Sequence, residues 1–158
     1  MKPEIVYMKG DAVYPQTAGN KIIVHVCNDI GGWGKGFVTA LSKRWKAPEK
    51  QYREWHKSGE GFALGAVQFV QVEDDMWIAN IIGQHDITRK GSAGKPPVRY
   101  EAIAAGLKKT GAFAVTLGAT VHMPRIGCGL AGGTWDRIEP LIQADMLDKY
   151  IEVTVYDL

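Results

Sequence analysis

Residues 21–27 (KIIVHVC) form an almost unbroken apolar run in which four of the side chains are β-branched. A strand with one exposed face alternates apolar and polar residues, whereas a continuous run is typical of a strand covered on both faces. Such strands lie near the middle of sheets that carry helices on both sides. The run therefore predicts an α/β fold with residues 21–27 in a central strand.

The rest of the chain alternates between strand-like and helix-like patterns. Phe37, Leu41 and Trp45 recur every four residues, which predicts one apolar stripe on a helix. Pro48 is suited to the first turn of a second helix. Further strands are expected at residues 4–8, 64–72, 77–83, 120–123 and 151–156, and further helices from about Tyr100 and Thr134. This alternation predicts a three-layer α/β/α fold with a central mixed, largely parallel six-stranded sheet.

Length and composition favour one ordinary globular domain. A chain of 158 residues can bury one substantial core and is short for two, so residues 1–158 are interpreted as a single domain. The net charge of +2 is too small to predict direct nucleic-acid binding. Cys27 and Cys128 stand in no metal-ligand spacing, and we expect no metal or cofactor. No apolar run is long enough to span a bilayer and the start of the sequence carries no signal-peptide core, so we expect no membrane association and a cytoplasmic protein. We also expect a monomer.

Two glycine-rich segments, residues 31–36 and 127–133, each follow a predicted strand and precede a predicted helix. In that setting free backbone N–H groups and the helix dipole can bind phosphate. Ligands of open α/β sheets bind beyond the carboxyl ends of the strands, so two such loops facing one crevice would suit a diphosphate. The alternative is that these glycines only form turns. Neither segment matches a nucleotide triphosphate-binding loop or a dinucleotide-binding fingerprint.

Four segments, in order along nearly the whole chain, carry a resemblance to a known family. They are Lys9-Gly10-Asp11, residues 24–36 (VHVCNDIGGWGKG), residues 123–130 (MPRIGCGL) and residues 153–158 (VTVYDL). Together they resemble the macrodomain family, and within it the subgroup of terminal ADP-ribose protein glycohydrolase, the yeast ADP-ribose-1''-phosphate phosphatase and a chromatin-remodeller macrodomain. The resemblance implies that the chain binds ADP-ribose and ADP-ribosylated proteins.

The resemblance also implies roles for individual residues. Asp11 would accept a hydrogen bond from the adenine amino group, and the alternative is an aspartate that caps a turn or a helix. Asn28 would bind the distal ribose, and Trp33, between glycines, is a candidate wall for that ribose or else a packing residue. The implied ligand-binding set is Gly10, Asp11, Asn28, Trp33, Gly34, Lys35, Gly36, Pro124, Arg125, Ile126, Gly127, Cys128, Gly129, Leu130, Ala131, Tyr156 and Leu158.

The sequence departs from the family pattern where the glutamate-deconjugating glycohydrolase has its catalytic lysine and aspartate. Gln84 and Ala131 stand at these positions, and neither can act as an amine nucleophile or a general base. The polar residues that remain near the expected ribose are Asn28, Asp29, Gln84, His85 and Asp136.

A water held by Asn28 and the ligand's phosphate could attack the anomeric carbon, with His85 or Asp29 as proton shuttle. His25 and His122 lie inside predicted strands and are expected to be structural. Three functions stay open: hydrolysis of ADP-ribose esters on acidic side chains, binding of ADP-ribose without turnover, and ADP-ribose-1''-phosphate hydrolysis.

Overall fold

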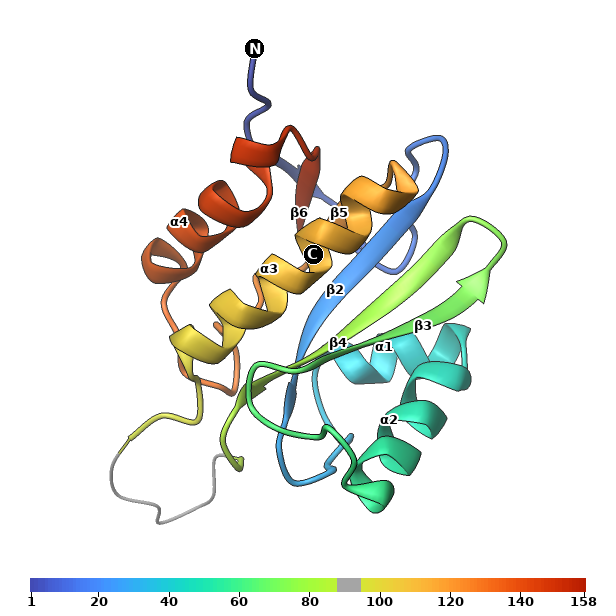
Figure 1. Cartoon of the computed structure of the whole chain (residues 1–158), viewed down its shortest axis with the longest axis vertical. Coiled ribbons are helices and arrows are strands. Elements are labelled where there is room, and N and C mark those ends of the chain that lie inside the picture. Colours follow the sequence, from blue (N-terminus) through green and yellow to red (C-terminus); the bar gives the residue numbers. More distant parts are fainter. Residues whose placement is uncertain (88–94) are drawn as a thin grey trace.

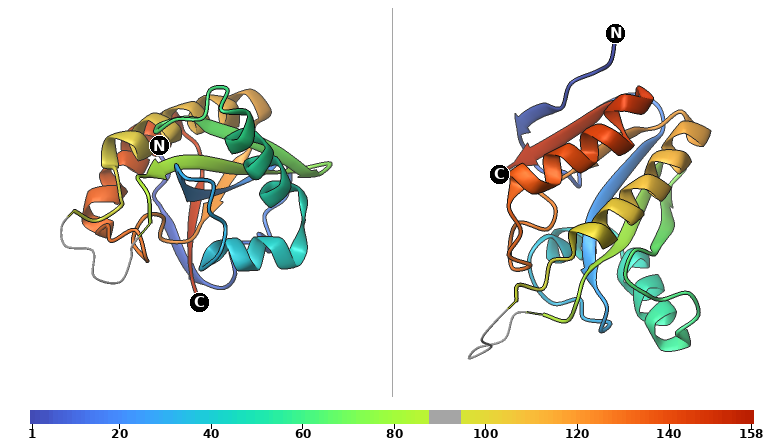
Figure 2. Two further views of the ribbon diagram at one scale, coloured as in Figure 1. Left: turned by 90° about the horizontal axis from the view of Figure 1, so that it is seen from below. Right: turned by 60° about the vertical axis from the view of Figure 1, so that its left-hand side comes forward.

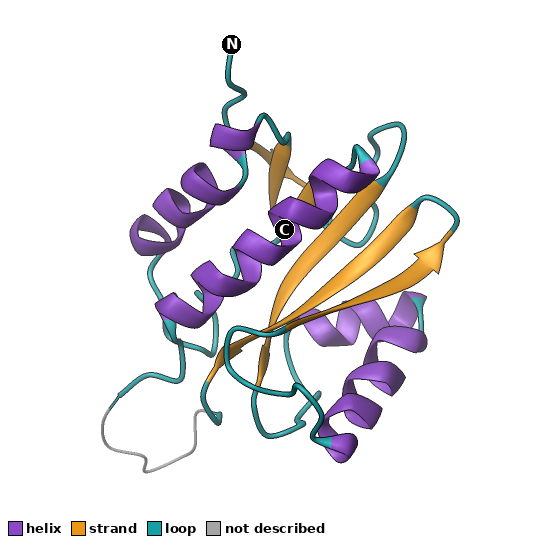
Figure 3. Cartoon of the chain, in the orientation of Figure 1, coloured by secondary structure: helices purple, strands orange, loops and turns teal. Residues whose placement is uncertain are grey.

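The computed structural model describes residues 1–87 and 95–158, which form one sheet flanked by helices. The strands are β1 (Val6–Lys9), β2 (Lys21–Asn28), β3 (Val67–Glu73), β4 (Met76–Gln84), β5 (Thr120–Met123) and β6 (Val153–Asp157). The helices are α1 (Phe37–Arg44), α2 (Ala47–Ser58), α3 (Tyr100–Leu117) and α4 (Trp135–Asp145), with a 3-10 turn η1 (Leu147–Lys149) before β6. Figures 1 and 3 show their arrangement.

The sheet has the order β1-β6-β5-β2-β4-β3. Every neighbouring pair runs parallel except β3 and β4, which are antiparallel. The largely parallel six-stranded sheet predicted from the sequence is thus confirmed, with the antiparallel strand β3 at one edge. Strand β2 lies between β5 and β4. Strands β4 and β3 extend the sheet on one side of β2, and β5 and β6 extend it on the other side.

Helices cover both faces of the sheet, so the three-layer prediction is also confirmed (Figure 2). Strand β2 shows why its sequence is apolar throughout. Ile22 and Val24 face one core, which they share with Leu107 of α3 and Ile142 of α4. Ile23 lies between these two residues and faces the second core, which also contains residues of α1 and α2. Period-two alternation therefore buries both sets.

Most predicted strand boundaries and the end of the first predicted helix differ from the structure by one to three residues, and the backbone explains two of the differences. Strand β3 begins at Val67 and not at residue 64, because Gly65 adopts a φ of 88°, which is outside the extended conformation of a strand. Helix α1 ends at Arg44, and Trp45 follows with an extended backbone, φ −139° and ψ 141°, before α2 begins. Within the described residues, no helix is both long and apolar enough to cross a membrane.

Candidate functional site

The parallel strands place five chain segments at one edge of the sheet. Strands β1, β6, β5, β2 and β4 all point the same way, so the loops that follow them emerge together. The loop after β2 leads into α1, and the loop after β5 leads into α4. This edge is also where the strand order reverses, between β5 and β2, which is the usual place for a ligand crevice in an open α/β sheet.

A cleft of about 660 Å³, including the part open to solvent, lies at this edge. The two glycine-rich loops both line it, as the sequence predicted. Its lining residues are His25, Val26, Lys35, Gly36, Phe37, Val38, Gln84, Pro124, Arg125, Ile126, Gly127, Gly129, Leu130 and Ala131. Segments about a hundred residues apart in the chain therefore form opposite walls of one cleft.

Both walls present unpaired backbone donors. Among residues 1–87 and 95–158, the N–H groups of residues 34–38 donate no hydrogen bond within the chain, and the same holds for Arg125, Ile126, Gly127, Gly129 and Ala131. Helix α1 begins here without a side-chain cap and without an acidic residue in its first turn. The other three α-helices each carry an acidic residue there, at Glu49, Glu101 and Asp136. The free donors and the positive end of α1 favour an anion.

The charge of the cleft lining is positive. Among the described residues that line it, Lys35 and Arg125 are cationic and none is an aspartate or glutamate. Arg125 is held in place by Asp157, which accepts hydrogen bonds of 2.8 Å from Nε and 3.0 Å from Nη2. Its guanidinium also lies 5.2 Å from the ring centre of Tyr7 and 5.3 Å from that of Trp135. The cleft therefore suits an anionic ligand.

Asn28 is not among the residues that line the cleft, and its carboxamide is hydrogen-bonded within the chain. Oδ1 accepts hydrogen bonds from the N–H groups of Ile30 (3.0 Å) and Gly32 (2.9 Å), and Nδ2 donates to the Gly32 carbonyl at 2.9 Å. The side chain thereby folds the start of the first glycine loop. The water-holding role expected from the sequence stays a prediction.

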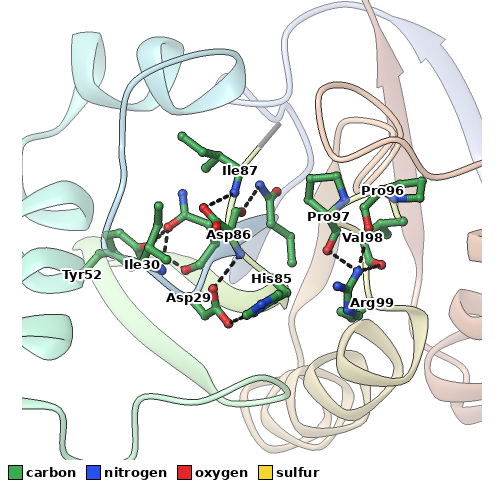
Figure 4. Close-up of polar contacts among 12 residues, drawn as sticks. Asp29, Ile30, Tyr52, His85, Asp86, Ile87, Pro96, Pro97, Val98 and Arg99 are labelled. Carbon is green, nitrogen blue, oxygen red and sulfur yellow. Dashed lines mark hydrogen bonds and ion pairs between the residues drawn. The ribbon is translucent and has the colours of Figure 1, made fainter. Parts of the chain in front are cut away.

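Asp29 and His85 meet beside the cleft, at the ends of the adjacent strands β2 and β4 (Figure 4). Asp29 Oδ2 lies 2.7 Å from His85 Nδ1, and Asp29 Oδ1 accepts the Asp86 N–H at 2.7 Å. Gln84, which does line the cleft, donates from Nε2 to the Asp86 carbonyl at 3.0 Å. The carboxylate thus orients the imidazole, and this pair stands next to a residue of the cleft wall.

Several predicted ligand contacts lie on the β1 and β6 side of this edge, outside the cleft lining. Asp11 Oδ1 accepts the Val13 N–H at 3.1 Å, so the turn role that the sequence left open is present. Tyr156 is buried, and its hydroxyl lies 2.7 Å from His122 Nδ1. Gly10 bonds to the Asp157 carbonyl, and Leu158 is exposed.

Trp33, Gly34, Cys128 and Asp136 do not line the cleft either. Trp33 is buried in the core under α1 and α2, where its indole N–H donates to Ser42 Oγ at 2.8 Å. The Cys128 thiol contacts the Ile126 carbonyl at 3.5 Å, and burial raises its pKa. Asp136 lies in the first turn of α4. The packing role for Trp33, which the sequence left open, is the one present.

The sequence did not single out Val26 and Val38 as part of the cleft, whereas Phe37 ends the first predicted phosphate-binding loop, residues 31–37. Phe37 and Val38 are the first two residues of α1, directly after the glycines, where N–H groups of a helix are always unpaired. That position was a usable signal. Val26 is the one residue of β2 that is partly exposed, and nothing in the sequence distinguishes it from the buried residues on either side.

The two strand histidines are interior groups, as predicted. His25 Nε2 lies 2.5 Å from Asn80 Oδ1, and burial lowers the pKa of His25 to about 4. His122 contacts Tyr156 and Thr120, and burial likewise lowers its pKa to about 4. His25 reaches the floor of the cleft, but both imidazoles are neutral in the folded protein near pH 7.

No protein-family model matches the chain. Comparison with solved structures gives a protein of unknown function from Bacteroides thetaiotaomicron, with 58% identity, 98% of both chains covered and a TM-score of 0.95. A macrodomain protein from Streptomyces coelicolor is 55% identical over 98% of this chain and 99% of that one, with a TM-score of 0.86. The chain belongs to the macrodomain family.

Curated relatives extend the likeness of this macrodomain. Chromodomain-helicase-DNA-binding protein 1-like from Danio rerio is 34% identical over 96% of this chain, which spans only 15% of that protein's length. ADP-ribose glycohydrolase OARD1 from Bos taurus is 29% identical over 98% of this chain and 91% of its own. An ADP-ribose 1''-phosphate phosphatase from Meyerozyma guilliermondii is 26% identical over 87% of this chain and 91% of its own. This macrodomain is thus related to proteins named for hydrolysis of ADP-ribose compounds.

Proposed function

We propose that this macrodomain binds ADP-ribose, with the diphosphate between the two glycine-rich loops. The observation that carries the proposal is the convergence of two sets of unpaired N–H groups on one cleft with Lys35 and Arg125 in its lining. The first set comes from residues 34–38, and the second comes from Arg125, Ile126, Gly127, Gly129 and Ala131. A diphosphate offers acceptors to both walls at once. The names of the relatives identify ADP-ribose as the diphosphate to test first.

The order of the strands supports one orientation of ADP-ribose in the cleft. Strands β6 and β1 lie on one side of the two glycine loops, and β4 lies on the other. We place the adenine toward Asp11, Tyr156 and Leu158, and the distal ribose toward Gln84. This orientation puts the anomeric carbon of the distal ribose on the same side as the Asp29–His85 pair.

We further propose that the protein hydrolyses esters of ADP-ribose with acidic side chains. Water attacks the anomeric carbon, the bond from that carbon to the carboxylate oxygen breaks, and the free carboxylate leaves. His85 Nε2 takes the proton from the water, because Asp29 holds the other ring nitrogen. The full-length likeness to ADP-ribose glycohydrolase OARD1 supports a hydrolase.

A binding module without turnover is the second candidate. Gln84 and Ala131 line the cleft where a lysine and an aspartate would serve catalysis, and no carboxylate lines it within the described ranges. An amide and a methyl group offer no nucleophile or base. This candidate shares the ligand and the cleft, so binding alone does not separate it from the hydrolase.

Two measurements test these proposals in sequence. Calorimetry with ADP-ribose should show saturable binding, and absence of binding would refute the assignment of the cleft. Incubation with an auto-modified transferase that carries ester-linked ADP-ribose should release free ADP-ribose, and the His85→Ala variant should bind but release little. Tight binding with no release by the wild type would favour the binding module. Phosphate release from ADP-ribose-1''-phosphate, assayed separately, would indicate the phosphatase activity instead.

A further inference from the structure

The first glycine loop is held by a side chain from a different element, helix α2. The hydroxyl of Tyr52 lies 2.7 Å from the carbonyl oxygen of Asn28 and 2.9 Å from its Oδ1. Asn28 Oδ1 in turn accepts the N–H groups of Ile30 and Gly32. A short chain of hydrogen bonds therefore runs from α2 through Asn28 into the loop.

The hydrophobic core fixes the position of the Tyr52 side chain. Its side chain is fully buried, and its ring packs 5.4 Å from the centre of Trp33 and 5.8 Å from that of Phe62. Burial raises the pKa of the phenol far above its usual range, so the hydroxyl stays protonated and remains a donor. The position of that donor is set by the core and not by solvent.

Two neighbours of Tyr52 on α2 also contact the loop. Arg53 Nη1 donates to the Gly31 carbonyl at 3.2 Å. The His56 ring lies against Gly31, where an added Cβ would come within 2.3 Å of Nδ1, and Gly31 has a φ of 77°. Residues 52, 53 and 56 share one side of a helix, so one side of α2 supports the turn at Gly31.

We infer that Tyr52 is a positioning residue which, through the Asn28 carboxamide, fixes the loop that presents N–H groups of residues 34–38 to the cleft. The inference rests on the proposed function for its ligand. A loop held in its binding conformation loses little conformational entropy when the ligand arrives. Removal of the Tyr52 hydroxyl leaves Asn28 bonded to Ile30 and Gly32. We therefore expect the loop to become more mobile while the fold is kept.

The experiment compares Tyr52→Phe with a matched variant, Thr110→Val. Thr110 is also fully buried, and its hydroxyl donates to the Gly106 carbonyl at 2.8 Å within α3, away from the cleft. Tyr52→Phe should weaken ADP-ribose binding about tenfold by calorimetry, the equivalent of one hydrogen bond. It should also speed amide hydrogen exchange at Ile30 and Gly32. Thr110→Val should lower the melting temperature and leave both quantities unchanged.

A double variant shows whether Tyr52 acts through Asn28. Asn28→Ala should weaken binding, and adding Tyr52→Phe to it should cost less affinity than Tyr52→Phe costs in the wild type, because the carboxamide is already gone and only the bond to the Asn28 carbonyl remains to be lost. Additive losses would overturn the inference, as would unchanged affinity and exchange in Tyr52→Phe, or equal losses in Thr110→Val. If the wild type does not bind ADP-ribose, the proposed function fails, and exchange at Ile30 and Gly32 still decides whether Tyr52 positions the loop.

Discussion

Asp29 and His85, 56 residues apart in the chain, are joined by a 2.7 Å hydrogen bond between Oδ2 and Nδ1. The other carboxylate oxygen of Asp29 is fixed by the Asp86 N–H. With Nδ1 facing the carboxylate, Nε2 carries the lone pair and can accept a proton. Substitution of Asp29 should therefore change which nitrogen of His85 carries the proton.

Asp29→Asn should lower ester hydrolysis about a hundredfold while leaving ADP-ribose affinity nearly unchanged. The asparagine can keep the bond from the Asp86 N–H, but its amide would donate to His85 Nδ1 and move the ring proton to Nε2. Single-turnover release of ADP-ribose, measured beside calorimetry, separates the two quantities. A loss of affinity equal to the loss of rate would contradict the proton-transfer role.

Gly129→Val should weaken ADP-ribose binding at least about tenfold without unfolding the protein. A Cβ at Gly129 would meet no atom within 4 Å, so the new side chain would enter the cleft and not the core. Calorimetry measures the ADP-ribose affinity, and thermal melting measures whether the variant stays folded.

Gly127→Ala serves as the contrasting variant in the same loop. Gly127 has a φ of 74°, and an added Cβ would come within 3.0 Å of Ile103 Cδ1. A left-handed conformation costs an alanine about 1–2 kcal/mol, so this variant should lower the melting temperature clearly. Full affinity in Gly129→Val would show that this loop does not hold the ligand.

The free energy of unfolding should fall as the pH drops from about 6.5 toward 4. His25 and His122 have pKa values lowered to about 4 by burial, whereas the unfolded chain binds protons near the ordinary value of 6.5. The stabilisation from the neutral rings is therefore complete above pH 6.5 and is lost as the pH falls toward the folded pKa. Each histidine contributes on the order of 3 kcal/mol to the total loss.

Urea denaturation at several pH values measures this dependence. His122→Gln should reduce the slope of unfolding free energy against pH by about half, because one of the two titrating groups is removed. An unchanged slope would mean that His122 is protonated alike in the folded and unfolded states.

Gly111→Ala should destabilise the protein by about 2 kcal/mol or more, although alanine favours helices over glycine. An added Cβ at this position of α3 would lie 2.4 Å from the Asp145 carbonyl oxygen at the end of α4. A flexible side chain could rotate away from the added Cβ, but a backbone carbonyl oxygen within a helix cannot. Thr116→Ala, at an exposed position of the same helix, should be nearly neutral, and chemical denaturation of both variants makes the comparison.

Much of the fold was predictable because its signals are local. The unbroken run of β2 and the spacing of Phe37 and Leu41 reflect periodicities that any buried strand or amphipathic helix must have. The ends were harder to predict. Residues 64–66 continue the apolar pattern of β3, yet Gly65 has a φ of 88° and the strand begins only at Val67. Boundaries depend on contacts that periodicity does not record.

The site was predictable at the level of its loops and not of its side chains. Parallel strands bring their carboxyl ends together, so the convergence of the glycine loops followed from their positions in the chain. Which side chains face the cleft depends on tertiary hydrogen bonds. The Asn28 carboxamide is taken up by its own loop and by Tyr52, and Trp33 finds a partner in Ser42. Neither pairing has a signature in the sequence.

Strand β1 comes early in the chain, yet its neighbour in the sheet is β6, with Val6 opposite Thr154. That pairing closes nearly the longest loop the polypeptide can form, and contacts between such distant residues are slow to form during folding. We therefore expect Gly10 and Asp11, which follow β1, to reach this edge of the sheet only after β6 has docked beside β5. The adenine end of the proposed site would then be completed late in assembly, after the glycine-rich loops that follow β2 and β5 are in place.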